Sequence, residues 1–497
     1  MSIRSGSGRM GRDDGDRTFL WLTLGLALVI VVVGALAFLV GRAASNTAGT
    51  VAALGLPAPG APRPTQAPAS APAAGTVQPT SSPVLAPAAS YAPDTVWYFA
   101  DGGGAAPFTT TYVLMNAGDV AVQGTATFVT ESGPSREVTF TVRPQSRLTL
   151  PAASRSAQAV RLRADTPFFA ERVALGAKDS MSSGALLPAT TWYFPIVETR
   201  AGSDDQLLLA NFNAVAATAG VTFMAENGIT QTRQYTVPAM ARASVSMTRD
   251  LAPLSSVQPG TPRGAIVKSD LPIVVEQTTY LNGNTAAYSV GGSSALARTW
   301  YLAEGNTRIG YDTTLAVFNP GANPAKVLVT YIPEGRTPLI KAYTLGPGAP
   351  LHLSVRSDMP DAALAMTVEA DQPVVVERVM YLANGQAAHA TMGATAPAKD
   401  WLLPEAGTTT PALAFLIMLN PGTAPADITV TLLGAAGKPL EKKVTLAAAS
   451  RLALALDRDV PPAELSARVR SSQPVVVERV TYFAGAPGGM ASMGIPR

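Results

Sequence analysis

One pattern, a tryptophan-led block that occurs four times, constrains the fold of this chain more than any other feature. The blocks begin at Trp97, Trp192, Trp300 and Trp401, so they recur about every 100 residues. An asparagine follows each tryptophan at one fixed spacing: Asn116, Asn211, Asn319 and Asn420. Each block also has a proline followed at the fourth position by a glutamate, which gives Glu171, Glu276, Glu377 and Glu478. This shared register predicts four copies of one folded unit.

The apolar residues inside a block recur with a period of two, which predicts β-strands. Ile428, Val430 and Leu432, for example, alternate with threonines. Clusters of Gly, Pro and Asn interrupt such runs at short intervals, and no capped amphipathic helix is evident after residue 92. About seven strands in about 100 residues is typical of an immunoglobulin-like sandwich, here without its disulfide.

The predicted fold class is therefore all-β, with four tandem immunoglobulin-like β-sandwich domains. We place these domains at residues 93–190, 191–298, 299–399 and 400–497. Each is long enough to have its own core, so we expect beads on a string. A four-bladed β-propeller is the weaker alternative, because propeller blades are shorter than these blocks.

These motifs resemble a tandem β-repeat family of unknown function in bacterial surface proteins. The similarity is in the Trp-Tyr-Leu-Ala-Glu-Gly opening at Trp300, the Asn-Pro-Gly turn at Asn319 and the Pro-Val-Val-Val-Glu-Arg strand ending at Arg378. It covers residues 95–497 and implies an exported, repetitive, β-rich protein without catalytic residues. The second block departs most, with Pro195 and Ile196 after its aromatic residues and Gln277 in place of arginine.

Residues 18–40 form an uncharged apolar segment, which is long enough to cross a bilayer as a helix. Four arginines precede it, so the positive-inside rule predicts a cytoplasmic tail at residues 1–17 and outward-facing repeats. The chain is then a single-pass protein of the cell membrane with a signal-anchor. A cleaved signal peptide is the alternative, but Arg42 occupies the expected cleavage region.

Residues 41–92 are predicted to be a disordered linker. Nine prolines stand among Ala, Ser, Thr and Gly, and few residues there could form a core. Such a segment favours extended states of at most ~3.1 Å per residue, so it would act as a stalk between the membrane and the repeats.

The composition excludes several kinds of stabilisation and partner. There is no cysteine, which removes disulfides and thiolate metal sites. Once the six arginines and three aspartates of residues 1–92 are set aside, the remaining chain has 31 basic and 31 acidic residues. A net charge of zero indicates no electrostatic attraction for nucleic acid, so we expect none as a partner.

The usual signatures of enzymes are absent from the sequence. Only two histidines occur, His352 and His389, so a histidine-based triad or metal site in every block is impossible. No nucleophile elbow, zinc-protease motif, phosphate-binding loop or EF-hand loop is present. We therefore predict no enzymatic activity and no catalytic, cofactor or metal site, and treat the recurrent Trp, Asn and Glu residues as structural markers.

The recurrent glutamate has three interpretations: structural anchor, calcium ligand or catalytic acid. A glycosidase needs a second carboxylate, and Asp101, Glu304 and Glu405 recur without a counterpart at Ile196. Because the glutamate shares a strand face with apolar residues, we expect an anchor that finds donors from backbone amides or arginine. Arg147, Arg242 and Arg451 are the candidate arginines, with Leu351 in the third block.

The recurrent aromatic residues have two interpretations, a sugar-stacking platform or a plug in the core, and their place at the start of each block favours the core. The sequence thus predicts a surface protein that presents its repeats for adhesion or for binding a cell-wall, glycan or protein ligand. The alternative is a structural spacer or envelope component without a specific ligand.

Overall fold

A computed structural model gives the fold of most of the chain beyond the predicted linker. It describes residues 95–102, 108–152, 156–175, 180–184, 187–197, 202–226, 228, 230–251, 261–409, 412–435, 438–458, 460–483 and 488–497. The chain divides into two compact units, Met1–Ser82 and Pro83–Arg497. The predicted tail (1–17), membrane helix (18–40) and linker (41–92) lie outside the described residues. Within the described ranges, no helix has both the length and the apolar character needed to cross a membrane.

The second unit is built almost entirely of β-strands, which confirms the all-β prediction. Its helical elements among the described residues are short: α2 (Met247–Leu251), α3 (Val355–Asp358) and η1 (Ala383–Gly385). Burial alternates along many strands, as the period of two predicted. In β25 (Ala426–Gly434), for example, Ile428 and Val430 are buried whereas Asp427 is exposed.

The first repeat contains two antiparallel sheets of four strands. Their strand orders are β1-β6-β3-β4 and β5-β2-β7-β8. The strands of repeat 1 are β1 (Val96–Phe99), β2 (Thr109–Asn116), β3 (Val122–Thr130), β4 (Gly133–Val142), β5 (Ser146–Pro151), β6 (Ala159–Ala164), β7 (Phe169–Leu175) and β8 (Ser180–Gly184).

The other repeats follow the same plan, except that one long strand replaces the sixth and seventh strands. Repeat 2 has β9 (Ala189–Phe194), β10 (Asp204–Asn211), β11 (Ala217–Ala225), β12 (Thr230–Val237), β13 (Ala241–Ser246), β14 (Arg263–Leu281) and β15 (Ala286–Gly291). Repeat 3 has β16 (Ala297–Leu302), β17 (Tyr311–Asn319), β18 (Ala325–Pro333), β19 (Leu339–Leu345), β20 (Ala349–Ser354), β21 (Leu364–Leu382) and β22 (Ala387–Met392). Repeat 4 has β23 (Ala398–Leu403), β24 (Ala412–Asn420), β25, β26 (Leu440–Leu446), β27 (Ser450–Ala455), β28 (Leu465–Phe483), β29 (Gly489–Met493) and β30 (Ile495–Pro496). The strands that open repeats 2 to 4 start at Ala189, Ala297 and Ala398, just before the predicted domain starts.

The long strand explains why the strand order differs from that of an immunoglobulin domain. In immunoglobulin sheets the sixth and seventh strands are neighbours in one sheet. In repeat 2, the first half of β14 pairs with β9 and β11, whereas its second half pairs with β10 and β15. Because one strand passes from the first sheet to the second, the segments that match β6 and β7 belong to different sheets.

Each repeat buries apolar side chains between its two sheets, but these cores continue into neighbouring repeats. The core of repeat 2 contains Trp192 from β9 and Leu207 from β10. Leu402 and Leu433 of repeat 4 belong to the core of repeat 1, and Tyr301 of repeat 3 belongs to that of repeat 4. Independent beads on a string are therefore wrong for this chain, because the repeats share apolar surface within one compact unit.

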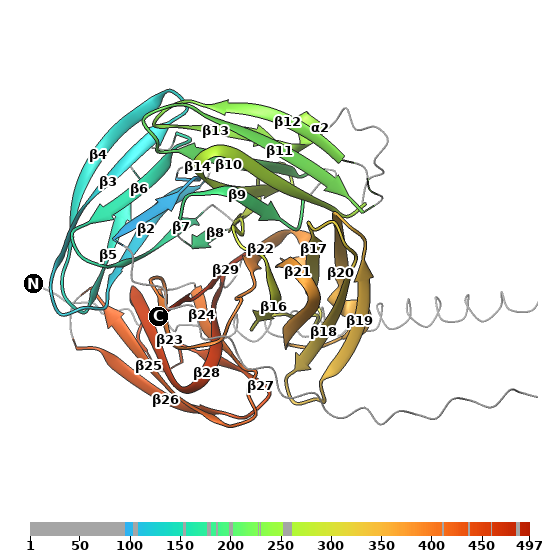
Figure 1. Cartoon of the computed structure of the whole chain (residues 1–497). Coiled ribbons are helices and arrows are strands. Elements are labelled where there is room, and N and C mark those ends of the chain that lie inside the picture. Colours follow the sequence, from blue (N-terminus) through green and yellow to red (C-terminus); the bar gives the residue numbers. More distant parts are fainter. Residues whose placement is uncertain are drawn as a thin grey trace, which may run out of the picture. The chain divides into compact units, whose positions relative to one another are not determined.

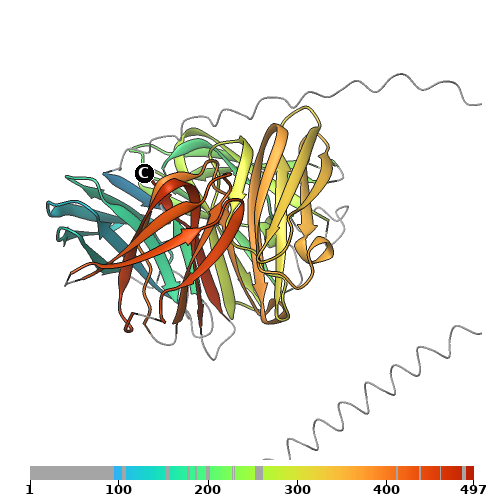
Figure 2. The same cartoon turned by 90° about the horizontal axis from the view of Figure 1, so that it is seen from below.

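The repeats close into a cycle. The inner strand β15 lies against β8 and β22, and β29 lies against β22 and β8, so repeat 4 contacts repeat 1 (Figure 1). The view in Figure 2 likewise shows the first repeat, in blue and teal, beside the fourth, in red. Cyclic closure is a property of β-propellers, but each repeat here contributes two sets of paired strands, which are separate sheets in repeat 1 and are joined by the long strand in repeats 2 to 4.

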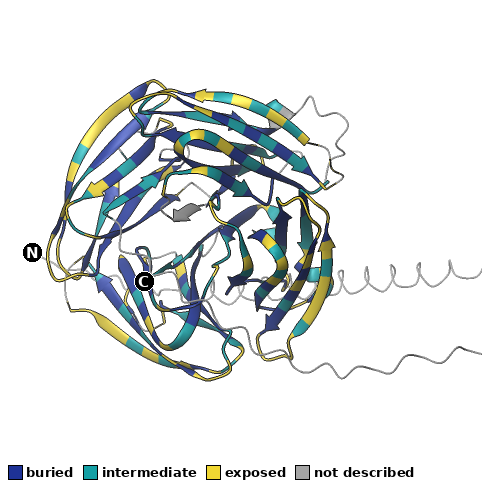
Figure 3. Ribbon diagram, in the orientation of Figure 1, coloured by how far each residue is buried: buried dark blue, intermediate teal, exposed yellow. Residues whose placement is uncertain are grey.

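Burial follows the distance from the centre of this cycle. Figure 3 shows many exposed residues on the outer strands β4, β12, β19 and β26. In contrast, β15, β22 and β29 are buried at every position except the last. Small residues such as Ala286, Ala387 and Gly489 on these inner strands let their backbones approach closely.

Candidate functional site

The four recurrent tryptophans are core residues. Their exposed fractions are 7% or less. Each indole Nε1 donates a hydrogen bond to the carbonyl of the residue after the recurrent proline: Trp97 to Phe168 (2.7 Å), Trp192 to Ile273 (3.0 Å), Trp300 to Val374 (3.0 Å) and Trp401 to Val475 (2.9 Å). This bond joins the first strand of a repeat to its seventh-strand segment. Because the rings are buried, these tryptophans are not exposed platforms for sugar stacking.

The four recurrent asparagines hold the turn that follows the second strand. The Asn319 side-chain amide donates to the carbonyls of Asn323 (2.7 Å) and Gly346 (2.9 Å), and its oxygen accepts from the Gly321 amide (3.1 Å). Equivalent bonds occur at Asn116, Asn211 and Asn420. One side chain thus satisfies backbone groups of two loops, a local role that needs no ligand.

The recurrent glutamates lie at the interfaces between repeats. Three of them accept hydrogen bonds from backbone amides just after the tryptophan of the preceding repeat in the cycle. The donors are Ala100 (3.1 Å) and Asp101 (3.4 Å) for Glu276, Ala303 (2.6 Å) and Glu304 (3.2 Å) for Glu478, and Glu405 (3.3 Å) for Glu171. These contacts define a 1/2, a 3/4 and a 4/1 interface, named by the repeats they join. The anchor interpretation is therefore supported, but the anchor acts between repeats.

An arginine of the same preceding repeat also binds each of these three glutamates. It is the residue directly after the recurrent glutamate of the preceding repeat. The ion pairs are Arg172 with Glu276 (3.3 Å), Arg378 with Glu478 (3.0 Å) and Arg479 with Glu171 (2.6 Å). All six side chains are buried, so each interface contains a desolvated charge pair whose partners come from different repeats.

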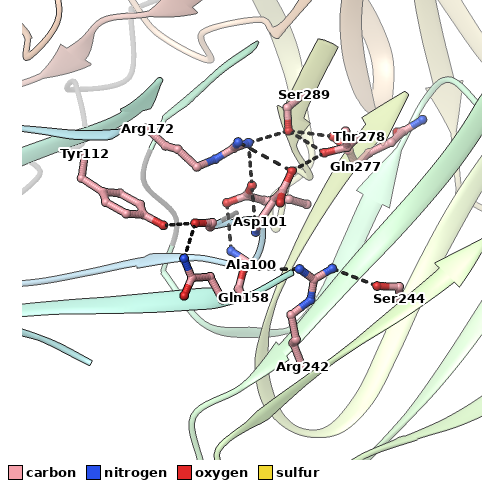
Figure 4. A network of polar contacts seen from close by, with 12 residues as sticks. Ala100, Asp101, Tyr112, Gln158, Arg172, Arg242, Ser244, Gln277, Thr278 and Ser289 are labelled. Atoms are coloured by element: carbon pink, nitrogen blue, oxygen red, sulfur yellow. Dashed lines mark hydrogen bonds and ion pairs between the residues drawn. The ribbon is translucent and has the colours of Figure 1, made fainter. Parts of the chain in front are cut away.

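The 1/2 interface shows the complete network (Figure 4). Arg172 contacts Ser289 (2.7 Å) and Asp101 (3.6 Å) in addition to Glu276. Thr278 donates to Asp101 (2.9 Å). Burial raises the pKa of Glu276 to about 7, and the neighbouring Arg172 opposes this rise. The network therefore includes a carboxyl group that is ready to take up a proton near neutral pH.

A second set of arginines binds the acidic residue four positions after the tryptophan. Arg451 lies 2.5 Å from Glu304 and Arg147 lies 2.9 Å from Glu405. Arg242 donates instead to the Gln158 carbonyl (3.3 Å). We predicted that these arginines serve the recurrent glutamates, and that was wrong: they bind other groups of the neighbouring repeat.

The interface between repeats 2 and 3, the 2/3 interface, departs from this pattern. Gln277 replaces the arginine that binds the glutamate, and Ile196 replaces the acid. The position of the second arginine is held by Pro350, and not by Leu351 as the sequence comparison indicated. Glu377 is fully buried, and burial raises its pKa well above the usual value. Asp205 raises this pKa further, whereas the Ile196 amide lowers it.

The two histidines have different environments. His352 shares a hydrogen bond with the Pro195 carbonyl (3.0 Å), across the 2/3 interface. His389 is buried with no hydrogen bond to either ring nitrogen among the described residues, and its ring lies 6.2 Å from that of Tyr482. Burial lowers the pKa of His389 well below its usual value, and Arg378 and Arg479 lower it further.

The recurrent charges meet at these interfaces, which the motifs alone did not indicate. One signal for it was present: the second block loses its acid at Ile196, and the third loses its arginine at Pro350. Across the part of the chain that the structure describes, no group of three or more His, Cys, Asp or Glu residues could hold a metal ion.

Comparison with known proteins shows no family and no curated relative. No known protein family matches the chain, and no curated protein matches it. The resemblance to a tandem β-repeat family therefore stays a prediction.

Two solved structures are similar in part. One, the crystal structure of Thermotoga maritima 1070, is 21% identical over 20% of this chain and 93% of its own, with a TM-score of 0.19. The other, a tetra-tandem repeat in the extending region of a large adhesion protein, is 14% identical over 76% of this chain and 91% of its own, with a TM-score of 0.12. Both TM-scores are too low to indicate a shared arrangement of the repeats.

Proposed function

We propose that this chain is a non-catalytic, membrane-anchored surface protein whose four repeats form one compact binding head. The head would serve adhesion or the binding of a cell-envelope, glycan or protein ligand. The observation that carries the proposal is the contact of repeat 4 with repeat 1 through Arg479 and Glu171.

Cyclic closure bears on the choice between a binding head and a spacer. Repeats joined end to end gain reach with every copy. Here the fourth repeat returns to the first, so additional copies add contacts but little length. The predicted linker at 41–92 would supply the reach instead, and the apolar segment at 18–40 would supply the anchor.

The burial of the recurrent charged side chains, and their pairing with one another, supports a non-catalytic role. The recurrent glutamates and their arginines are buried, and at three interfaces they bind one another or backbone amides. A general acid or base has to reach a substrate proton. Ligand contact is therefore expected on the exposed outer strands β4, β12, β19 and β26 and on the connecting loops, where binding residues commonly occur.

The proposed function can be tested with the purified full-length chain in detergent. We expect saturable binding to a glycan array or to cell-wall fractions, and weaker binding by an Arg479→Ala variant whose 4/1 interface is opened. If the folded chain binds no glycan, wall fraction or envelope protein in a saturable way, the binding role is wrong and an envelope component without a ligand is favoured.

The proposed topology needs a separate measurement. Protease added to intact cells should cleave within residues 95–497 and leave the N-terminal tail protected. Protection of the repeats until the cells are opened would contradict the outward orientation.

A further inference from the structure

At the 2/3 interface, the four positions that carry charge elsewhere hold one acid and no arginine. At each of the other interfaces these positions hold two acids and two arginines: Glu276, Asp101, Arg172 and Arg242 at 1/2, Glu478, Glu304, Arg378 and Arg451 at 3/4, and Glu171, Glu405, Arg479 and Arg147 at 4/1. At the 2/3 interface the equivalent residues are Glu377, Ile196, Gln277 and Pro350. Glu377 thus lacks the guanidinium that neutralises the recurrent glutamate of the other interfaces.

The carboxyl group of Glu377 lies in an environment that disfavours a negative charge. Its side chain is 0% exposed. Burial and then Asp205 raise its pKa, and among the described residues the Ile196 amide opposes this rise. Asp205 accepts hydrogen bonds from Gln277 (2.7 Å) and Thr279 (3.2 Å), which indicates its ionised form. A carboxylate on Glu377 would therefore be buried beside a second negative charge.

The other titratable groups around Glu377 supply no positive charge at neutral pH. His352 lies two strands away in the same row of the sheet, and Tyr288 and Tyr381 lie in the adjoining apolar cluster. The ordinary pKa is about 6.5 for an imidazole and about 10 for a tyrosine hydroxyl, so both groups are mainly neutral between these values. Burial lowers the pKa of Arg263 on β14, and no described carboxylate offsets this effect, so this arginine is not the missing partner.

Gln277 presents an acceptor where the other interfaces present a donor. Its amide nitrogen donates to the Ile196 carbonyl (3.0 Å) and to Asp205 (2.7 Å), both in its own repeat. This fixes the orientation of the amide, and its oxygen has no hydrogen-bond partner among the described residues. At the other interfaces the residue at this position contacts the glutamate of the next repeat, so we expect the Gln277 oxygen to face Glu377. Two facing acceptors form a hydrogen bond only when one of them carries a proton.

We propose that Glu377 is protonated in the folded chain and donates a hydrogen bond to Oε1 of Gln277. A neutral carboxyl–amide pair then joins repeat 2 to repeat 3, in the place of the ion pair of the other interfaces. Loss of the proton as the pH rises leaves two facing acceptors and a buried charge. The 2/3 interface is thus a pH-sensitive seam in a cycle whose other interfaces contain arginine.

The pH dependence of stability tests for the proton. A glutamate in the unfolded chain releases its proton at a pH of about 4.3, whereas Glu377 in the folded chain keeps it at higher pH. The stability that this proton contributes is present at low pH and is lost as the pH rises toward the folded pKa. Glu377→Gln keeps a neutral donor and does not titrate. Between pH 5 and pH 8, the ratio of folded to unfolded full-length chain should therefore fall more steeply for the wild type than for Glu377→Gln, by about tenfold per pH unit.

A matched control and a spectroscopic signature separate the proton from general stability. Glu369→Gln changes an exposed glutamate of the same strand, so its pH profile should follow the wild type. At pH 8, the infrared difference spectrum between the wild type and Glu377→Gln should contain the carbonyl-stretch band of a protonated carboxyl group. Gln277→Arg supplies the guanidinium of the other interfaces, so this band should disappear and a carboxylate band should replace it.

Parallel pH profiles for the wild type and Glu377→Gln would overturn the proposal, because they would show that Glu377 is ionised in the folded chain. A protonated-carboxyl band that survives in Glu377→Gln and disappears in Asp205→Asn would place the proton on Asp205 and would overturn it as well. Survival of the band in a folded Gln277→Arg variant would show that position 277 does not face Glu377.

Discussion

Arg479 and Glu171 are separated by 308 residues in sequence, yet Nη2 of the arginine lies 2.6 Å from Oε1 of the glutamate. This pair joins the last repeat to the first. Both side chains are buried, so water does not screen the interaction. This ion pair therefore contributes to closure of the cycle, together with the Arg147–Glu405 pair and the packing of β29 against β8.

Replacement of Arg479 should open the cycle. Arg479→Ala leaves Glu171 buried without its guanidinium, which costs about 3–5 kcal/mol in free energy of unfolding. Chemical denaturation measures this loss, and small-angle scattering should show a larger radius of gyration. Arg249→Ala is the control, because Arg249 pairs with Asp250 at the surface, where 73% of the arginine side chain is exposed, and its loss should cost about 0–1 kcal/mol. If the two variants lowered the free energy of unfolding equally, the buried pair of Arg479 and Glu171 would have no special role in joining repeat 4 to repeat 1.

The turn asparagine offers a comparison within one loop. Asn319→Ala removes two bonds to carbonyls and one from the Gly321 amide, so we expect a loss of about 2–3 kcal/mol. Asn323→Ala changes an exposed side chain of the same loop and leaves its backbone carbonyl in place, so its effect should be within about 0.5 kcal/mol. Urea denaturation of both variants checks the difference.

Much of the fold inside one repeat could be predicted from the sequence because its causes are local. The period of two in β25 places Ile428 and Val430 on the buried face. The same tryptophan and asparagine recur because each fills the same place in its own repeat.

The contacts between repeats were harder to predict because their partners are distant and the copies are alike. A glutamate such as Glu478 could pair with an arginine of its own or of another repeat, and the motif is the same in both cases. The inner strands carried an overlooked signal. In β22 the run Ala387-Ala388-His389-Ala390 has no polar alternation, which is typical of a strand buried on both faces. The sequence also did not show that the long run of β21 belongs to two sheets.

The paired exceptions Ile196 and Pro350 predict a double-mutant cycle. In the 3/4 interface the equivalent positions hold Glu304 and Arg451, whose side chains lie 2.5 Å apart. Ile196→Glu alone buries an unpaired carboxylate beside Glu377 and should cost about 3–5 kcal/mol. Adding Pro350→Arg should recover most of this loss, because the new arginine provides the missing partner. The coupling energy from denaturation of the wild type, both single variants and the double variant measures the pairing. A coupling near zero would show that these two positions do not face each other.

Buried His389 predicts a loss of stability on mild acidification. Its pKa in the folded chain is well below its usual value, because of burial and then Arg378 and Arg479. Below a pH of about 6.5 the unfolded chain binds a proton on this histidine that the folded chain does not. Its contribution to stability therefore falls by about 1.4 kcal/mol for each further pH unit until the folded pKa is reached.

Glu276 has the opposite effect on the pH dependence of stability. Its pKa is raised to about 7 in the folded chain, so the folded chain binds a proton more tightly than the unfolded chain does. The stability that this proton contributes is present at low pH and is lost as the pH rises from about 4.5 to 7. The informative quantity is therefore the difference between the wild type and His389→Met, which introduces the residue that repeat 4 has at the equivalent position, Met490. Denaturation at pH 7.5, 6.5 and 5.5 should show the variant gaining on the wild type by about 1 kcal/mol over the last step. Parallel pH profiles for the wild type and His389→Met would mean that the pKa of His389 is the same in the folded and the unfolded chain, which would contradict its burial as a neutral imidazole.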